Sequence, residues 1–274
     1  MSLFKCPICG GKLERGEKSY ACSSGHSYDI AAEGYVNLLP VNKKHSKLPG
    51  DDKNMVRARS RFLSSGYYEP LRKALIGLVL ERSSEPPAIL DSGCGEGYYT
   101  EGIYDALKSA GITSLVAGID ISKEAVKLAA KRVKSAEFAV ASAYSLPLNI
   151  ERIDLLLNCF SPLCGSEFRR VLKTGGYFIY VVPAPRHLWE MKRAVYDSPY
   201  ENERHIAEYE GFELVKKETV DERISIPNRQ TISDLFTMTP YFWKTPQEGA
   251  SRLLSLDSLE TEISFDIYVY RKTV

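Results

Sequence analysis

The chain has 274 residues, enough for one or two domains with a substantial core. Apolar residues make up 44% of it and charged residues 26%, and the net charge of +1 does not by itself indicate a nucleic-acid or membrane partner. The longest apolar patch, residues 74–80, is far too short to span a bilayer, and the sequence opens on no signal peptide. We therefore expect a cytoplasmic protein without a membrane partner, whose cysteines stay reduced.

The amino-terminal region, residues 1–40, carries a pattern of metal ligands. Cys6, Cys9, Cys22 and His26 follow the spacing C-x2-C-x12-C-x3-H, which is typical of two knuckles that close one tetrahedral site. Thiolates and a neutral imidazole suit Zn²⁺, and four protein ligands leave no open position on the metal. The pattern therefore predicts one structural zinc site. A redox-active C-x-x-C pair is the alternative, but that motif needs a βαβ context that is missing here.

Residues 41–61 form a basic stretch, with seven lysines and arginines against two aspartates. The Pro-Gly pair at 49–50 indicates a turn or a linker. Clustered positive charge predicts a phosphate-binding face, although a solvated linker followed by an exposed helix would have the same composition. Apolar spacing and capping residues predict helices over residues 53–65 and 69–82.

The next feature is a glycine-rich turn. A short apolar run ends in Asp91 and gives way to Gly93, Gly95 and Gly97. This predicts a buried strand, a tight turn and the start of a helix, with a backbone that a nucleotide-like ligand can approach closely. A dinucleotide fingerprint would need glycine at the position of Tyr98. The pattern D-x-G-x-G-x-G instead resembles motif I of the class I methyltransferases, whose ligand is S-adenosylmethionine.

Predicted strands and helices alternate through the rest of the chain. Strands are expected over residues 114–120, 137–141, 153–157, 177–182, 212–226 and 260–272, and helices over residues 101–111, 122–133 and 167–173. The alternation predicts a doubly wound, mostly parallel sheet with its ligand at the carboxyl ends of the strands. Asp120 ends one strand, where a carboxylate can accept both ribose hydroxyls of a nucleoside. Ser142 follows another, where methyltransferases commonly carry an acidic residue near the adenine amine.

Nearly the whole chain resembles one family, the bacterial 23S rRNA (guanine-N1)-methyltransferases. The residues that carry the resemblance are Cys6-Pro-x-Cys9, Cys22, His26, Glu33-Gly-Tyr-Val-Asn-Leu-Leu-Pro40, Pro49-Gly-Asp51, Ala58-Arg59, Phe62-Leu63, Gly66, Tyr68, Pro70-Leu71, Gly93-Cys-Gly-Glu-Gly-Tyr-Tyr-Thr100, Pro185-Arg-His-Leu188 and Met238-Thr-Pro240. The glycine-rich turn is shared by very many methyltransferases. The metal module joined to residues 33–40 is much more specific.

The resemblance implies a Rossmann-like class I methyltransferase fold, with a mostly parallel seven-stranded sheet and a small N-terminal zinc-binding module. It implies a homodimeric enzyme that methylates N1 of a guanine in a 23S rRNA hairpin. We expect residues 1–40 to be a zinc-binding RNA-recognition module, residues 41–85 a basic linker with helices, and residues 86–274 the methyltransferase domain. The resemblance also makes the basic stretch a candidate RNA contact.

The candidate site residues fall into two groups. The resemblance implies zinc on Cys6, Cys9, Cys22 and His26, and it places Tyr68, the turn at residues 95–97 and His187 in the cofactor pocket. Together with the residues from the strand ends, the candidate cofactor-binding set is Tyr68, Asp91, Gly93, Gly95, Glu96, Gly97, Asp120, Ser142 and His187.

No catalytic base is assigned. Guanine N1 carries a proton at neutral pH, so a base or a strong acceptor should help to remove it. Asn158 follows a strand in the usual methyl-acceptor region, but an amide cannot act as a base. His187 could titrate in a suitable range, although the resemblance gives it to the cofactor.

Two other functions remain open at this stage. One is a small-molecule S-adenosylmethionine-dependent methyltransferase with a structural zinc module, and the other is a non-catalytic RNA-binding protein. The aromatic cluster at residues 238–243 has two interpretations as well, either core packing or a base-stacking or pocket wall.

Overall fold

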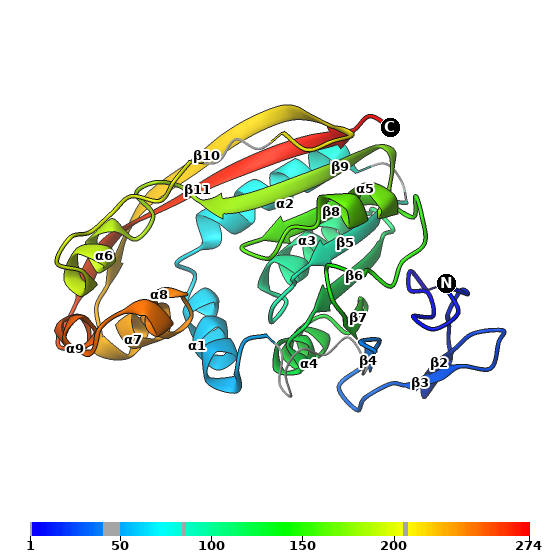
Figure 1. Ribbon diagram of the computed structural model, residues 1–274, viewed down its shortest axis with the longest axis horizontal. Coiled ribbons are helices and arrows are strands. Elements are labelled where there is room, and N and C mark those ends of the chain that lie inside the picture. The colour runs from blue at the N-terminus through cyan, green and yellow to red at the C-terminus, as the bar shows by residue number, and fades with distance from the viewer. Residues whose placement is uncertain (1, 41–49, 84–85, 205–207) are drawn as a thin grey trace.

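A mixed eight-stranded sheet forms the centre of the computed structural model, which describes residues 2–40, 50–83, 86–204 and 208–274 (Figure 1). Its strand order is β10-β11-β9-β8-β5-β6-β7-β4. The strands are β4 (Tyr35–Asn37), β5 (Ala88–Ser92), β6 (Leu115–Asp120), β7 (Glu137–Val140), β8 (Ile153–Cys159), β9 (Leu172–Pro183), β10 (Phe212–Ile226) and β11 (Leu259–Lys272). From β9 to β4 the neighbours are parallel, whereas β11 pairs antiparallel with both β9 and β10.

This sheet confirms the predicted class I methyltransferase fold and adds one strand to the seven expected. The additional strand, β4, comes from the amino-terminal region and pairs with β7, with Tyr35 opposite Phe138. Tyr35 and Val36 are both buried, and they enter hydrophobic clusters on opposite faces of the sheet. Successive side chains of a strand point to opposite faces of the sheet, so both faces gain a buried residue. A strand of three residues is too short to give a periodic signal in the sequence.

Helices cover both faces of the sheet. Those that precede β10 in the chain are α1 (Lys53–Ser64), α2 (Glu69–Arg82), α3 (Tyr98–Ser109), α4 (Lys123–Arg132), α5 (Gly165–Val171) and α6 (Trp189–Val195). Buried residues of α2, α3 and α4 share one cluster with Ile89 of β5, and the next residue, Leu90, joins Phe168 of α5 in the other. The strict alternation along β5 fixes which helices lie on which face.

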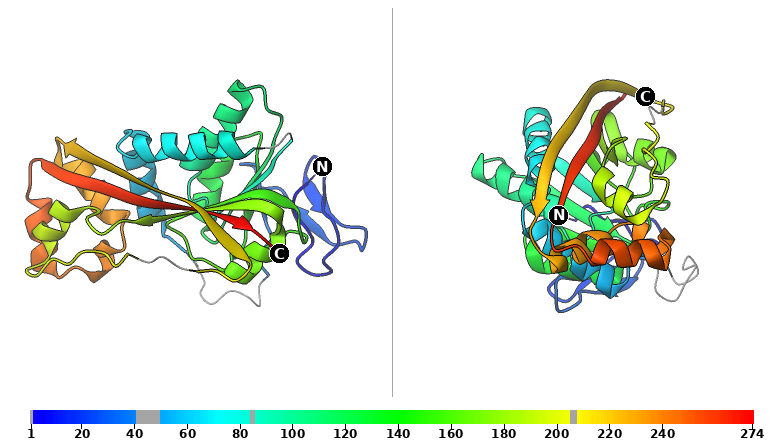
Figure 2. Two further views of the ribbon diagram at one scale, coloured as in Figure 1. Left: turned by 90° about the horizontal axis from the view of Figure 1, so that it is seen from above. Right: turned by 90° about the vertical axis from the view of Figure 1, so that its left-hand side faces the viewer.

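The amino-terminal module packs on the same face as α5. It contains a small antiparallel sheet of β1 (Glu14–Arg15), β2 (Ser19–Ala21) and β3 (Ser27–Asp29), at one end of the long axis of the molecule (Figures 1 and 2). Leu3, Phe4 and Tyr20 are almost fully buried in the cluster that contains Phe168. The Tyr20 hydroxyl donates a 2.9 Å hydrogen bond to Glu137 at the start of β7. The module therefore shares its core with the sheet.

The opposite end of the molecule is a group of short helices at the end of the long antiparallel pair β10–β11 (Figure 2). Besides α6 it contains α7 (Arg229–Thr237), α8 (Tyr241–Lys244) and α9 (Gln247–Leu254). The arrowheads of β8 and β9 point toward this group (Figure 1). Arg61 of α1 joins the group to the rest of the protein through a two-pronged ion pair with Asp234 of α7. The carboxyl ends of the parallel strands thus face a helical cap.

Candidate functional site

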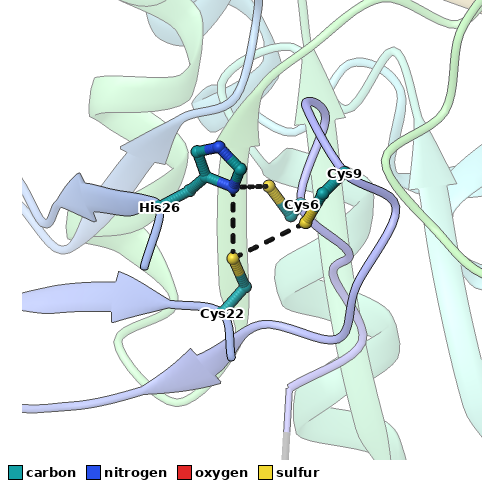
Figure 3. A group of neighbouring side chains, drawn as sticks. All are labelled: Cys6, Cys9, Cys22 and His26. Carbon is teal, nitrogen blue, oxygen red and sulfur yellow. Dashed lines mark hydrogen bonds between the residues drawn. The ribbon is translucent and has the colours of Figure 1, made fainter. Parts of the chain in front are cut away.

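The four predicted metal ligands converge at one point (Figure 3). Cys6 and Cys9 come from the first knuckle and Cys22 and His26 from the turn between β2 and β3, and their ligand atoms all lie within 4.8 Å of one another. Cys6 Sγ and Cys22 Sγ lie 3.6 and 3.4 Å from His26 Nδ1, and Cys9 Sγ lies 3.6 Å from Cys22 Sγ.

These spacings fit a zinc ion. Bonds of about 2.3 Å to sulfur and 2.1 Å to nitrogen place ligand atoms at tetrahedral corners roughly 3.6–3.8 Å apart. The Tyr28 hydroxyl lies 3.0 Å from Cys6 Sγ, where it can donate a hydrogen bond to the thiolate and orient it. A hydrogen bond from the backbone of Gly11 is the largest cause that lowers the pKa of Cys9 to about 6, which favours the metal-binding thiolate. The site is therefore built for zinc, with Nδ1 as the histidine ligand.

The glycine-rich turn connects β5 to α3 at the carboxyl edge of the sheet. Because β5 lies between β8 and β6, this edge is the point where the strand order changes direction, and ligands of open α/β sheets bind there. A Cβ atom on Gly93 would come within 1.9 Å of Ser161 Oγ, so only glycine lets the loop after β8 lie against the turn. Gly95 has φ +54°, and a Cβ there would meet nothing closer than Arg59 Nη1 at 4.0 Å. The backbone at Gly95 is thus open to a ligand.

Asp120 lies beside this turn as predicted. Its Oδ2 accepts a 3.0 Å hydrogen bond from the Gly95 amide, and its Oδ1 accepts one of 2.8 Å from the Ser122 amide. Each carboxylate oxygen keeps a further lone pair, so the group can still accept from two donors such as the hydroxyls of a ribose. Burial raises the pKa of Asp120 above its ordinary value.

Asp91 is buried directly under the turn. The Thr100 hydroxyl donates a 2.6 Å hydrogen bond to its Oδ2 and lowers its pKa, but burial dominates and raises that pKa to about 7. The nearby carboxylates of Asp120 and Glu96 contribute in the same direction. A cluster of carboxylates with raised pKa values is a site that a cationic ligand would stabilise.

Tyr68 and His187 lie together although 119 residues separate them in the sequence. The Ser264 amide donates a 3.2 Å hydrogen bond to His187 Nδ1, so the ring proton is on Nε2, 3.3 Å from the Tyr68 hydroxyl oxygen. Burial lowers the pKa of His187 to about 3. The expectation that His187 could titrate near neutral pH is therefore wrong, because burial keeps the ring neutral.

Two other predicted residues have different surroundings. Glu96 is almost fully buried, and its carboxylate lies 3.3 Å from Arg132 of α4, so its ion pair ties the turn to that helix. Ser142 lines a cavity of about 230 Å³ beside the zinc module, together with Lys5 and Arg170. Its hydroxyl accepts a 3.2 Å hydrogen bond from the Tyr144 amide.

The structure also brings residues to the site that were not predicted there. Arg59 of the basic stretch lies beside Gly95. It ion-pairs with Asp51 and donates a hydrogen bond to the backbone oxygen of Met238. The Asp51 backbone oxygen accepts a 2.8 Å hydrogen bond from the Ser122 hydroxyl. Both residues belong to the stretches that carry the family resemblance, and that was the available signal. Lys43, Lys44 and Lys47 of the same stretch lie outside the described residues.

The buried polar atoms at this edge support a ligand site. Within the described chain, Ser92 Oγ, Tyr99 Oη and Asn158 Oδ1 are buried without a hydrogen-bond partner. Together with the open backbone at Gly95 and the two acceptor oxygens of Asp120, they fit a polar nucleoside ligand such as S-adenosylmethionine. The aromatic cluster is divided: Met238 is buried and Tyr241 packs against the main hydrophobic cluster, whereas Phe242 and Trp243 are exposed at 38% and 64%.

Two protein families match separate parts of the chain. Residues 4–47 match a zinc-ribbon family described as "RlmA, N-terminal", and residues 84–231 match one described as "Methyltransferase domain". Fold and site thus define a class I methyltransferase that carries a zinc ribbon, with S-adenosylmethionine and zinc as its cofactors.

Individual relatives extend the similarity over the whole chain. A Bacillus subtilis protein, provisionally named a 23S rRNA (guanine-N1)-methyltransferase, is 32% identical over 99% of this chain and 98% of its own length. The 23S rRNA (guanine(748)-N1)-methyltransferase of Streptomyces fradiae is 31% identical over 98% of this chain and 96% of its own. The chain belongs to the family of 23S rRNA (guanine-N1)-methyltransferases. Within the described residues, no helix is long and apolar enough to cross a membrane.

Proposed function

We propose that the protein transfers the methyl group of S-adenosylmethionine to N1 of a guanine in 23S rRNA. The observation that carries this proposal is the end-to-end similarity to enzymes of that name, in a chain that has the complete glycine-rich turn and the complete set of zinc ligands. A small-molecule methyltransferase would have no evident use for the zinc ribbon. A non-catalytic RNA-binding protein would have no reason to keep Asp91 and Asp120 beside an open glycine turn.

The candidate cofactor-binding residues have different proposed roles. Asp120 accepts the ribose hydroxyls, the open backbone at Gly95 lets the nucleoside approach, and Asp91 provides negative charge for the cationic methionine end. Gly93 and Gly97 shape the turn, because their missing side chains let it pack against Ser161 and Ala129. The Tyr68 hydroxyl oxygen accepts a hydrogen bond from His187 Nε2–H, so its own O–H group is free to donate toward the cofactor. Glu96 positions the turn through Arg132. No contact of Ser142 with adenine is proposed.

Methyl transfer requires mainly that the nucleophile be aligned with the methyl group. The cofactor supplies a methyl group on a sulfonium, which needs little activation once a nucleophile lies in line with it. In the transfer, the N1 lone pair forms the new bond to carbon, the sulfur leaves as a thioether, and the N1 proton is lost. His187 is not the acceptor of that proton, because its pKa is about 3 and both ring nitrogens are engaged.

RNA recognition is assigned to the amino-terminal part. We propose that residues 1–40 and the basic residues of 41–61 bind the rRNA backbone and that residues 86–274, together with Tyr68, carry out methyl transfer. The enzyme is proposed to act in the cytoplasm as a homodimer, for which light scattering after gel filtration should give twice the 30.7 kDa of one chain.

Primer extension on 23S rRNA tests the function directly. A methyl group on N1 blocks Watson–Crick pairing, so reverse transcription should stop at one guanine after incubation with the protein and S-adenosylmethionine. Asp120→Ala is the matched negative control, because it removes the ribose acceptor and leaves the zinc site intact. Methyl transfer only to a small metabolite, to cytosine or to guanine N2 would contradict the proposal, and RNA binding without any transfer would favour the non-catalytic alternative.

A further inference from the structure

Phe160 follows β8 directly and has an uncommon backbone conformation. Its φ is +53°, in the left-handed region that a bulky side chain rarely adopts and that costs free energy. Nonlocal contacts impose it. The Phe160 amide donates a 3.2 Å hydrogen bond to the Val181 oxygen, and Asn158 Nδ2 donates to the backbone oxygens of Ser92 and Pro162, each at 3.2 Å. The loop after β8 is thus braced against both neighbouring strands.

The same conformation leaves the aromatic ring at the surface. Phe160 is 44% exposed, and its covered side lies against Phe265, with ring centroids 5.5 Å apart. Phe265 is fully buried and contacts both Tyr68 and His187, at centroid distances of 4.8 and 4.6 Å. Phe160 is therefore the outer ring of a four-ring cluster whose inner members are rigidly packed.

This exposed ring lies next to the glycine-rich turn. Its neighbour Ser161 occupies the space that a side chain on Gly93 would need, and Asn158 binds Ser92. The ring is consequently at the switch point of the sheet, where the methyl donor binds. A strained backbone that holds an apolar ring in solvent at such an edge has no use in folding, but it would serve a flat ligand.

We propose that Phe160 is the stacking wall of a subsite for the target base, a purine turned out of the RNA. The inference rests on the proposed function and deepens it. Guanine N1 lies on the pairing edge of the base, so a paired guanine must leave its helix before it can reach the methyl group. A base that leaves its stack loses contact with its neighbours, and an aromatic side chain restores that contact.

Kinetics of three substitutions at this position test the subsite. Phe160→Ala should lower kcat/KM for 23S rRNA by about 5- to 150-fold, the range expected for the loss of one aromatic–base stack. Phe160→Tyr keeps an aromatic face and should stay close to the wild type. Phe160→Leu is the matched control, because it keeps apolar bulk without a flat ring and should behave like the alanine variant. All three should bind S-adenosylmethionine as the wild type does in calorimetry.

A binding measurement gives an independent readout. A fluorescent guanine analogue at the mapped position of an RNA hairpin should be quenched by the wild-type protein and by Phe160→Tyr, but not by Phe160→Ala. Leucine and tyrosine variants of equal activity, an alanine variant within twofold of the wild type, or loss of S-adenosylmethionine binding in Phe160→Ala would each overturn the inference. Failure of the wild type to methylate guanine N1 would instead refute the proposed function on which it rests.

Discussion

Among single residues, Asp91 should make the binding of the cofactor depend on pH. Burial raises its pKa to about 7, so below that value the carboxyl is mostly protonated and carries no charge. A cationic ligand favours the ionised form, so binding must release a proton when the pH is below the pKa. We expect the affinity for S-adenosylmethionine to fall as pH drops below about 7, by up to about tenfold per pH unit. Calorimetry between pH 6 and 8 measures this.

Asp91→Asn should affect binding and stability in opposite directions. Because the pKa of Asp91 is raised in the folded state, the stability that it contributes is present at low pH and is lost as pH rises toward 7. The asparagine variant has no charge to bury, so at pH 8 its apo form should melt at a higher temperature than the wild type. Its affinity for S-adenosylmethionine should be weaker and nearly independent of pH over that range. An unchanged pH profile in the variant would show that another group titrates.

At the scale of elements, the zinc module is part of the main core. If the module folded independently, loss of zinc would leave residues 86–274 folded. However, β4 belongs to the central sheet, and Leu3, Phe4 and Tyr20 pack with Phe168. Exposing three such side chains costs roughly 5–9 kcal/mol. Cys22→Ser should therefore lower the melting temperature of the whole protein by about 10 °C or more.

Calorimetric unfolding and metal analysis check this prediction together. Cys164 is a suitable control, since it is half-buried and lies outside the metal site. Cys164→Ser should retain one zinc per chain and melt near the wild type. Two separate transitions in Cys22→Ser, with the larger one at the wild-type temperature, would show instead that the module and the sheet fold independently.

The elements also show how much the sequence could predict. Long strands such as β10 and β11 and the helices α1 and α2 have enough residues for a periodic pattern, and their positions were predicted within about two residues. The zinc ligands and the glycine turn were predictable because each motif is local. The strand β4 and the conformation of Phe160 were not, since both depend on partners far away in the chain. The surroundings of His187 likewise depend on Ser264 and Tyr68, so its burial and low pKa could not be read from its position.

At the scale of the whole molecule, the small net charge hides an uneven distribution. Four basic residues of α1 face different surroundings. Arg59 and Arg61 are bound to Asp51 and Asp234, whereas Lys53 and Arg57 are exposed and have no ion pair or hydrogen bond with the described residues. Only Lys53 and Arg57 can neutralise RNA phosphates without first breaking an internal contact, because Arg61, although 54% exposed, is held by Asp234. The basic residues of the helix therefore divide by their partners into two that hold the structure together and two that are available to a ligand.

Substitutions of the unpaired and of the paired basic residues of α1 should have separate effects. Replacing Lys53 and Arg57 by alanine should weaken 23S rRNA binding and lower the slope of log affinity against log salt by about 0.7–0.9 for each lost phosphate contact. The methylated guanine should stay the same, because phosphate contacts position the RNA and base contacts specify the sequence.

Arg61→Ala removes a similar charge but leaves the buried Asp234 carboxylate with less support, so it should cost about 1–3 kcal/mol of stability and change the salt slope little. Filter binding at several salt concentrations, with thermal melting of each variant, separates the two effects. Equal salt slopes for the double variant and the wild type would place the RNA on another surface.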